Sequence, residues 1–467
     1  MESVEIVESV EMLEPNALPV ALVPTPTNEY RQHRKRLKVL VEPGPPRPAS
    51  EAPIPVPSED TADLLGTRVL IYKQDPAVSE IGVRKSFLPG VFLSGPRDAR
   101  VRSGSPGIPP VEPNAFGDFI QVPDTDAFDA VHTYAVVRQT LRMYQRALAV
   151  GGSAAPLPWQ WNSGTNTEPL NVFPHGLPDV INAFYSRNQQ ALKFGHFIKS
   201  GTTTRVFTCR SFDIVAHETG HAILDGLKPN WIVSSGPQTG GLHEAFGDIS
   251  AIFVALSQLD QVEAVIAQTK ANLHDKTFLA DMAEEFGLAL GRPNGLRNAD
   301  NDLKLSETGT EVHAISQVFT GAIYDILADL FSLERKTAVQ DDAATLYEVS
   351  RYLLSVLIRA IVAAPASNAT FANVANQMLT ISVADSKPVE YQNSIRNQFT
   401  VREVVVSPTP LTADFETGTK LKAAFSDEKG AVQNRAGCCG TMNNSEYLEY
   451  DRYLDAERNA LAAALKD

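Results

Sequence analysis

The sequence contains little cysteine, which excludes a fold held together by disulfide bonds. Only 3 of its 467 residues are cysteines, and Cys438 and Cys439 are adjacent, so a bridge between these two would be strained. Basic residues are outnumbered by acidic ones, and the net charge of −14 at pH 7 disfavours general binding to nucleic acid. We therefore expect neither a disulfide framework nor a nucleic-acid partner.

The sequence also lacks the usual signals for secretion and membrane insertion. Residues 1–15, MESVEIVESVEMLEP, are acidic and have no basic region followed by an apolar stretch, as a secretory signal peptide would. We see no apolar run long enough to span a bilayer. The expectation is a monomer without a membrane partner, either cytoplasmic or exported by a route that these residues do not reveal.

Proline is abundant at the start of the chain and separates it from the rest. Residues 1–64 are rich in proline, glutamate and valine, and proline at this density disfavours helices and central strands. We predict a disordered leader there. At the other end, 407–467 is predicted to be an extension of loops that finishes in a polar helix over 446–467.

Between these ends, the spacing of apolar residues is first typical of strands and helices together and then of helices alone. This pattern predicts an α+β protein. We expect strands over 67–73 and 117–122 with a loop over 94–110, a helix over 126–148, and strand pieces with a turn over 179–197. Further helices are predicted over 211–226, 241–258, 260–272, 277–291, 311–333, 341–363, 369–381 and 390–404.

The stretch SFDIVAHETGHAILD, residues 211–225, carries the chemistry that stands out most. Positions four apart lie on one face of a helix, so His217 and His221 point the same way and can bind one metal ion. Glu218 follows the first histidine and can act as a general base beside the ion. Because the flanking residues are apolar, two histidines on this face would be hard to satisfy without a partner.

A zinc site needs a third protein ligand, and the sequence offers one on the next predicted helix. A third histidine six residues after His221 is not available, since Leu227 occupies that position. Glu244, in GGLHEAFGDISAIF, lies 23 residues after His221 and supplies a carboxylate instead. Asp248 shares the face of Glu244 and can accept a hydrogen bond from the outer nitrogen of a ligating histidine. His243 points elsewhere around this helix and is left outside the ligand set.

At this point the sequence resembles the thermolysin-like metallopeptidases, the gluzincin type with HExxH followed by ExxxD. The resemblance covers roughly residues 115–406 and includes the ordered set NAFY at 182–185, HETGH at 217–221, Glu244 with Asp248, and a Val-His pair ending at His313. It implies a two-lobe fold, with an N-terminal lobe over 65–226, a helical lobe over 227–406, and a zinc cleft between them.

The resemblance also implies roles for several residues. The segment DVINAFYSR is similar to the edge strand with which that family binds the substrate backbone, so Asn182 and Ala183 would contact the peptide. His313 would be the second catalytic histidine. Arg297, in GLRNADN, would bind a substrate carbonyl, and Zn²⁺ would be held by His217 and its partners.

Three features of the sequence depart from the family pattern. A tyrosine is expected between the zinc histidines and the glutamate ligand, but that segment contains Trp231 and no tyrosine. The aspartate partner of the second histidine falls near Thr308, and either Glu307 or Glu311 could replace it. Asp213 matches one calcium ligand of the family, but Ala255 stands where a second is expected, so we do not predict the double calcium site.

These observations lead to one functional hypothesis and one alternative. The hypothesis is a zinc-dependent endopeptidase that cleaves peptide or protein substrates, with a preference for apolar residues after the cut and Glu218 as the general base. The alternative is a non-catalytic zinc-containing protein, derived from such a peptidase, that binds peptides or partners. The missing tyrosine favours the alternative, whereas Glu218 favours the enzyme, because a structural zinc needs no base.

Overall fold

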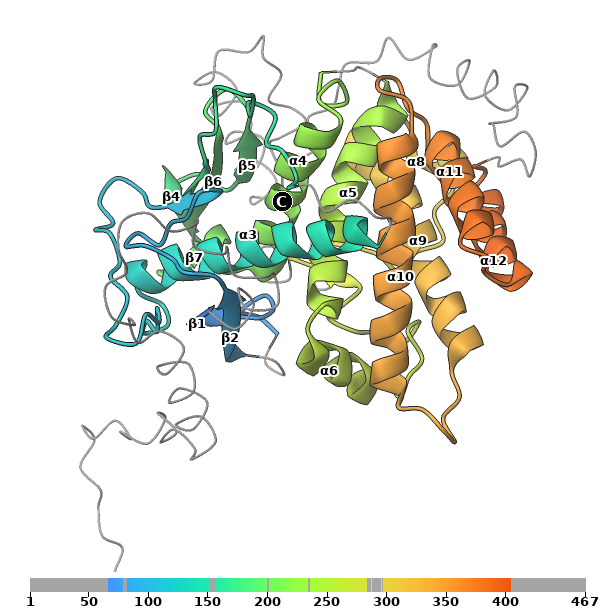
Figure 1. Ribbon diagram of the computed structural model, residues 1–467, viewed down its shortest axis with the longest axis horizontal. Coiled ribbons are helices and arrows are strands. Elements are labelled where there is room, and N and C mark those ends of the chain that lie inside the picture. The colour runs from blue at the N-terminus through green and yellow to red at the C-terminus, as the bar shows by residue number, and fades with distance from the viewer. Residues whose placement is uncertain are drawn as a thin grey trace, which may run out of the picture. The chain divides into compact units, whose positions relative to one another are not determined.

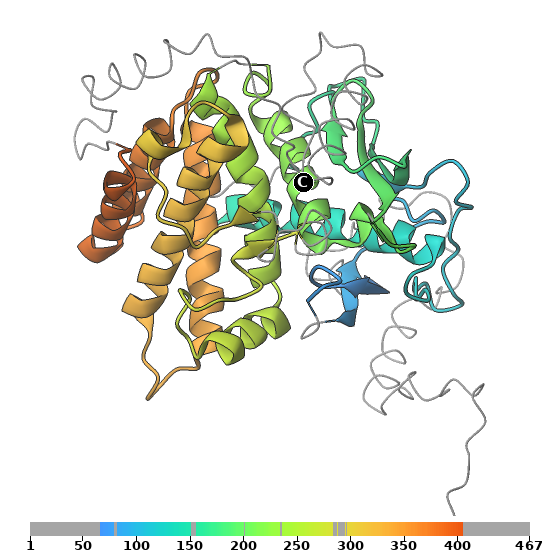
Figure 2. The ribbon, with the colours of Figure 1, turned by 180° about the vertical axis from the view of Figure 1, so that it is seen from behind.

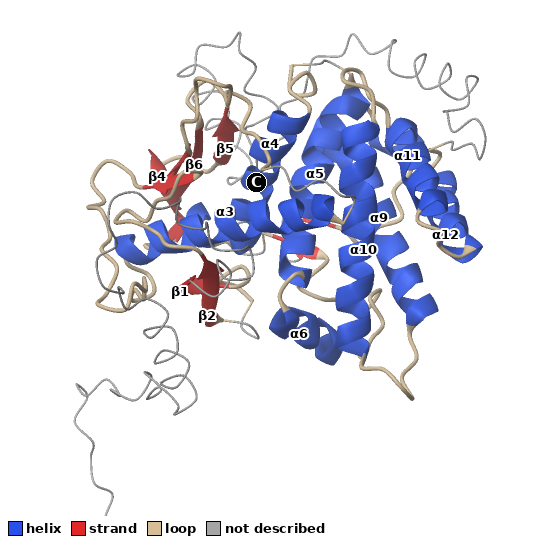
Figure 3. Cartoon of the chain, viewed as in Figure 1, coloured by secondary structure: helices blue, strands red, loops and turns tan. Residues whose placement is uncertain are grey.

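In the computed structural model, the described residues are 66–78, 82–150, 156–199, 201–233, 236–283, 287, 295 and 297–404. All of them belong to one compact unit, Glu59–Asp467. The predicted leader and the predicted C-terminal extension with its helix lie outside the described residues. Helices and strands are both present, so the predicted mixture of α and β structure is confirmed (Figure 3).

The first strands form a two-stranded antiparallel ribbon. Strand β1 (Gly66–Tyr72) pairs with β2 (Val83–Pro89), and β1 buries alternate residues, including Val69 and Ile71, as expected for a strand with one face on the core. The strand predicted over 67–73 is therefore confirmed.

The strand predicted over 117–122 is wrong. Phe119 makes only an isolated bridge to Val69, although its ring is buried. Gly117 adopts a positive φ of 78°, and the Asp118 carboxylate accepts hydrogen bonds from the backbone and side chain of Arg68. The segment is therefore held by a turn and a side-chain ion pair, and its apolar pattern reflects burial rather than a strand ladder.

A five-stranded mixed sheet follows, in the order β3-β4-β6-β5 with β7 also paired to β6. Strand β3 lies within the predicted loop over 94–110, and β4 was not predicted at all. The sequence of β4, LNVFPHGLP, contains a proline and a glycine, which weaken a strand signal; the ladder accommodates them with a register shift between Phe173 and Leu177. The strands are β3 (Val101–Ser103), β4 (Leu170–Pro178), β5 (Ala183–Ser186), β6 (Ala191–Ile198) and β7 (Arg205–Phe207).

Most predicted helices are present to within a few residues. Helix α5 begins earlier than predicted, because Pro237 occupies its first position and Gly240 and Gly241 continue the helix. The short 3-10 helix η1 (Thr208–Arg210) precedes α4. The helices are α3 (Asp126–Ala149), α4 (Phe212–Leu227), α5 (Pro237–Leu256), α6 (Leu259–Thr269), α8 (Leu305–Thr308), α9 (Val312–Glu334), α10 (Asp342–Ala363), α11 (Phe371–Ala384) and α12 (Val389–Val401).

The helix predicted over 277–291 is wrong for residues 277–283, whereas Gly287, the next described residue, is helical. Residues 278–280 form a turn, and β8 (Asp281–Met282) pairs antiparallel with β9 (Arg297–Asn298). Ala283 then adopts a positive φ of 53°, which no helix tolerates. The apolar residues that predicted a helix are buried by tertiary contacts instead.

Helix α9 is apolar enough to raise the question of a membrane. By length and composition alone it could cross a bilayer, contrary to the expectation from the sequence, and α5 with α6 passes the same test only as a pair bent by 94°. However, 78% of the most apolar window of α9 is buried inside the protein. Burial of this extent is typical of the core helix of a globular protein.

Helices α4 and α5 lie between the mixed sheet and helices α9 to α12, and this position determines where the site forms. In both views (Figure 1 and Figure 2) the strands β4 to β6 lie on one side of α4, and α9 to α12 lie beyond α5. Helix α4 packs against β5 as well as α5, and α5 packs against α9. Gly241 permits the last contact, because a Cβ there would lie 2.7 Å from Ile315.

Candidate metal centre

The two histidines of HETGH lie on the face of α4 that packs against α5. The helix begins at a Ser211 cap, whose hydroxyl accepts a hydrogen bond from the Ile214 backbone N–H. Residues 212–225 are all buried, so the helix has no solvent-facing side over most of its length. The rings of His217 and His221 lie 4.7 Å apart between centroids and are nearly perpendicular, at 87°.

Glu244 of α5 completes a group of three buried ligands. Its carboxylate oxygens lie 3.5 Å from His217 Nε2 and 3.6 Å from His221 Nε2, and one ligand atom from each residue lies within 4.8 Å of the other two. Gly247, one turn further along α5, allows the helix to approach, because a Cβ there would lie 2.6 Å from the His217 ring. The ligands predicted from the sequence are thus brought together.

The distances in this group fit a tetrahedral zinc site. Two ligands about 2.0–2.1 Å from one ion are about 3.3 Å apart in tetrahedral geometry, close to the separations of the two imidazole nitrogens from the Glu244 oxygens. Among the described residues, His217 Nε2 is buried and makes no hydrogen bond. A buried, unsatisfied nitrogen is costly unless a partner such as a cation binds it, so the residues fit the metal.

The outer nitrogen of His217 is held by a carboxylate. His217 Nδ1 lies 3.0 Å from Asp248 Oδ1, and Arg297 Nε donates to the other oxygen of Asp248 at 3.0 Å. Burial would raise the pKa of Asp248, but the charge of Arg297 and the hydrogen bond from His217 lower that pKa to about 2. An ionised Asp248 fixes the proton of His217 on Nδ1 and leaves Nε2 free to bind a cation.

The outer nitrogen of His221 has a different partner, His243, which sequence reasoning placed outside the site. The two Nδ1 atoms lie 2.6 Å apart, so one must donate and the other accept. Burial lowers the pKa of His243 to about 3 and, with the charges of His217 and His243, lowers the pKa of His221 well below its usual value. With His221 Nε2 facing Glu244, His221 donates from Nδ1, and His243 therefore carries its proton on Nε2.

Glu218 follows His217 on α4 and lines a small cavity beside it. The side chain is fully buried, and it lines, together with His217, Asp248 and Arg297, a cavity of about 10 Å³. That volume is close to what one water molecule requires. The base candidate and the first ligand therefore face the same space.

His313 approaches the ligand group from the first turn of α9. Its Nε2 lies 3.4 Å from Glu244 Oε2, and its Nδ1 lies 2.6 Å from Glu311 Oε1. Glu311 also caps α9 by accepting from the backbone N–H groups of His313 and Ala314. Glu307 instead accepts from the Lys304 backbone, so Glu311 is the carboxylate beside His313. Burial lowers the pKa of His313, but Glu244 and Glu311 outweigh it and raise this pKa.

The residues predicted to bind substrate lie in two places: Asn182 and Ala183 at an edge of the sheet, and Arg297 beside Asp248. Ala183 begins β5, the last strand in the sheet order, so in the described part of the chain one edge of β5 pairs with no other strand. Asn182 Oδ1 accepts from the Ala183 backbone at 2.8 Å, while its Nδ2 makes no hydrogen bond within the described residues. Arg297 is directed to Asp248 rather than to an open cleft, with a side chain only 8% exposed.

Trp231 does not take the place of the missing tyrosine. Its side chain is fully buried in the core, and its indole N–H donates to the Pro365 carbonyl at 3.0 Å. Asp213, the single match to a calcium ligand, is buried, and its pKa is raised well above the usual value by burial and by the charge of Asp75. Asp213 lines the small cavity beside His217 and Glu218, whereas Trp231 does not.

Two other groups of side chains in the described residues have a spacing that suits a metal. In the first, the Asp129 carboxylate already accepts two hydrogen bonds from Arg210 and contacts His175, so its charge is compensated. In the second, His274 is half exposed, and the aspartates beside it are only partly buried. The group on α4 and α5 is the one that is buried throughout.

Comparisons with known proteins identify no family: no protein-family model matches the chain, and no curated protein matches it.

Proposed function

We propose that the chain is a zinc-dependent endopeptidase of the thermolysin-like, gluzincin type. The observation that carries the proposal is the group formed by His217, His221 and Glu244, with Glu218 beside it. Their ligand atoms lie within 4.8 Å of one another, all are buried, and a buried carboxylate with no metal-binding role follows the first histidine. A purely structural zinc site has no use for that carboxylate.

The proposal includes the two-lobe arrangement, with 65–226 as the N-terminal lobe and 227–406 as the helical lobe. It is supported by the order of elements. Strands β1 to β7 precede the end of α4, whereas α5 to α12 follow it, and the strands described after α4 are the short pair β8 and β9. The ligands come from α4 and α5, the helices on either side of the proposed boundary.

In this mechanism the residues of the chain handle protons and orientation. His217, His221 and Glu244 would hold Zn²⁺, which would supply a Lewis acid able to acidify water and polarise a peptide carbonyl. Glu218 accepts a proton from the attacking water at its carboxylate and passes it to the leaving amine. His313, whose pKa is raised by Glu244 and Glu311, donates from Nε2 to the developing oxyanion.

The substrate is bound as an added strand in this proposal. The edge of β5 that pairs with no other strand in the described part of the chain would offer backbone groups to an extended peptide, and the Asn182 amide would add a donor at the start of that strand. Because such pairing reads the backbone, side-chain preference would come from the pocket beside it. We keep the predicted preference for apolar residues after the cut as part of the proposal, to be measured by digestion of a peptide library with and without a zinc chelator.

The decisive experiment is the substitution Glu218→Gln, which keeps the size of the side chain but removes the base. We expect the variant to bind zinc as the wild type does and to lose casein cleavage by about 10²–10⁴-fold, the range typical of a general base. The matched control is Glu263→Gln on α6, where the carboxylate is exposed, and this variant should retain full activity. A Glu218→Gln protein that cleaves casein at the wild-type rate would contradict the proposal.

The alternative is a non-catalytic zinc protein that binds peptides. It is favoured by the missing tyrosine, since Trp231 is committed to the core. The same experiment separates the two functions. A wild-type protein that contains zinc and binds peptides, but shows no cleavage that a zinc chelator abolishes, would support the alternative and exclude the endopeptidase.

A further inference from the structure

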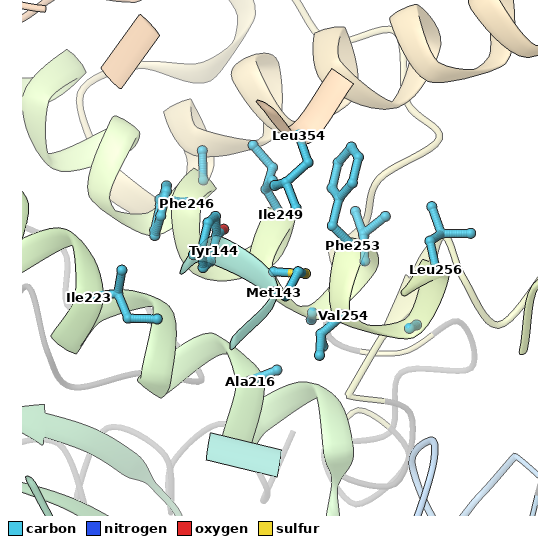
Figure 4. Packing of buried hydrophobic residues seen from close by; sticks show 14 of the residues in the cluster. Met143, Tyr144, Ala216, Ile223, Phe246, Ile249, Phe253, Val254, Leu256 and Leu354 are labelled. Atoms are coloured by element: carbon cyan, nitrogen blue, oxygen red, sulfur yellow. The ribbon is translucent and has the colours of Figure 1, made fainter. Parts of the chain in front are cut away.

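The proposed metal ligands and the groups that orient them differ in how firmly the fold holds them. All three ligands lie on α4 and α5, two long helices whose apolar side chains belong to one hydrophobic cluster. Figure 4 shows part of this cluster, including Ala216 and Ile223 of α4 and Phe246 and Ile249 of α5. Because side chains in such a core are closely packed, the two helices are fixed relative to each other.

Arg297, by contrast, lies in β9, a strand of only two residues. Its Nε donates to Asp248, the carboxylate that holds the outer nitrogen of His217. In the described part of the chain, β9 pairs with one other strand, the equally short β8, and both residues of β9 are only partly buried. Isolated two-stranded pairings are marginally stable, so the position of Arg297 depends on further contacts of this segment.

Asn301 connects the segment after β9 to helix α9. Its side-chain Nδ2 donates to the backbone carbonyl of Asn298, at 3.0 Å, and to that of Gln317, at 3.2 Å. Gln317 follows His313 by about one turn of α9. The Oδ1 atom of the same side chain accepts from the backbone N–H two residues further on, at 3.1 Å. One side chain therefore links the backbone next to Arg297 with the part of α9 next to His313.

Two further residues make this contact possible. Gly321 of α9 leaves room for it, because a Cβ there would lie 3.0 Å from the side-chain amide of Asn301 and 3.1 Å from the guanidinium carbon of Arg402. The buried Arg402, at the end of α12, donates to the backbone carbonyls of Asn301 and Leu303 and to the carboxylate of Asp325 on α9. Arg402 thus holds the backbone of Asn301, while the side chain of Asn301 holds the segment after β9.

We propose that Asn301 is a positioning residue of the metal centre. It holds Arg297 on Asp248, so that His217 keeps its orientation, and it fixes this group relative to His313. Asn301 touches neither the metal ligands nor the cavity beside them, and it acts on them through Arg297. The inference rests on the proposed function, because it takes His217 as a zinc ligand, and groups that orient a ligating histidine are expected to affect metal affinity.

The test compares Asn301→Ala with Asn162→Ala in the full chain. Asn162 makes the same kind of contact in a loop outside the metal centre: its Nδ2 donates to the carbonyls of Asn166 and Glu168, and its Oδ1 accepts from the Trp159 N–H. Both variants should be destabilised to urea by similar amounts. Only Asn301→Ala should lose zinc affinity, by about 10–100-fold, in competition with a fluorescent chelator. Wild-type zinc affinity in a folded Asn301→Ala protein would overturn the proposal.

A double-mutant cycle tests whether Asn301 acts through Arg297. Arg297→Ala should itself lower the zinc affinity, because Asp248 then loses its partner. If Asn301 acts through Arg297, adding Asn301→Ala to this variant should change the zinc affinity by less than about twofold. Two effects that simply add would show that Asn301 acts by another route, and would overturn the proposal.

Gly321→Ala gives a second variant that keeps every side chain of the contact. Alanine favours a helix more than glycine does, so α9 should form as before, but the added Cβ crowds the side chain of Asn301. We expect the zinc affinity to fall by about twofold or more, in the same direction as for Asn301→Ala. Where Asn301→Ala does not fold, an unchanged zinc affinity in Gly321→Ala decides against the proposal.

Activity measurements separate this inference from the proposed function. With zinc at saturation, Asn301→Ala should lower kcat for a peptide substrate by about tenfold or more and leave KM nearly unchanged, because the orientation of His217 and His313 affects the transition state. A wild-type protein that binds zinc but cleaves no peptide would contradict the endopeptidase, whereas the zinc affinities of the variants would still support or overturn the role of Asn301.

Discussion

Two buried clusters in this protein contain the same residue types but differ in how their charges are satisfied. In the cluster on α3, Asp129 is bound by His175 at 2.9 Å and by Arg210 at 2.8 and 3.1 Å. In the cluster on α4 and α5, His217 and His313 each direct a buried Nε2 that makes no hydrogen bond among the described residues, and both approach Glu244.

The difference teaches how a structural cluster can be distinguished from a site. Around Asp129 each charged group meets an opposite charge, so the cluster is complete without an added partner. Around Glu244 several nitrogen atoms converge on one carboxylate, and their outer nitrogens are occupied by Asp248, His243 and Glu311. The inner nitrogens are thereby oriented toward a common point, which is the arrangement that binds a cation.

The largest expected effect is the loss of zinc when one ligand is removed. If three protein ligands share the binding free energy of about 10–16 kcal/mol typical of zinc sites, His221→Ala should cost on the order of 4 kcal/mol, or about 1,000-fold in affinity. Competition with a fluorescent chelator measures this. His274→Ala, at a half-exposed histidine outside the group, should leave the zinc affinity unaltered. Equal zinc affinity in the two variants would contradict the assignment of the metal centre.

The next largest effect is expected from removing the carboxylate at the centre of the Asp129 cluster. Asp129→Ala leaves Arg210 and His175 without their buried carboxylate, and we expect the free energy of unfolding to fall by about 3–5 kcal/mol with zinc affinity unchanged. Urea denaturation measures the loss. The matched variant Asp260→Ala removes a partly exposed carboxylate that pairs with Lys73, and it should cost less than about 1 kcal/mol. Loss of zinc from the Asp129→Ala protein would mean that the two clusters are not independent.

A smaller effect is expected at His243, the outer partner of His221. His243→Leu removes the acceptor of the His221 Nδ1 proton, and zinc affinity should fall about 10–100-fold, as for other outer partners. His243→Asn keeps an acceptor at that position and should restore most of the affinity. The unfolding of the metal-free proteins serves as the control for packing. Equal zinc affinity in the leucine and wild-type proteins would show that the contact has no orienting role.

The smallest effect is the pH dependence of the stabilisation that the Asp129 cluster contributes. Burial would raise the pKa of Asp129, but the hydrogen bonds from His175 and Arg210 outweigh it, so the folded pKa lies below the usual value. The stabilisation by Asp129 is therefore fully present above the unfolded pKa of about 3.9 and is lost as the pH falls through the lower folded pKa. The difference in unfolding free energy between wild type and Asp129→Ala should shrink below about pH 4, and a difference that stays constant to pH 2 would contradict this assignment.

Local sequence patterns predicted most of the helices because their apolar residues recur with the helical period. The same reasoning failed where burial without regular structure produced a similar pattern. Phe119 and the residues around Met282 are apolar because they enter the core, yet Phe119 makes only an isolated bridge and Met282 lies in a two-residue strand. Strand β4 was missed for the opposite reason, since its proline and glycine conceal a strand that a register shift accommodates.

The candidate site was more predictable than the fold around it, although not in full. The spacing of His217, Glu218 and His221 depends only on helix geometry, so their shared location on α4 followed from the sequence. The role of His243 did not, because its ring meets His221 only through the packing of α5 on α4. The one available signal was its position directly before Glu244. The choice of Glu311 over Glu307 likewise required the capping geometry of α9.

The sequence alone determined which residues share a helix face, because backbone geometry converts a spacing of four into a common direction. Only the tertiary structure decided which helix faces pack together and which charged side chains come into contact. It brought Glu244 to the two histidines and directed Arg297 to Asp248. The physical reason is that side chains far apart in the chain interact only after helices pack, and their hydrogen bonds and pKa values depend on those contacts.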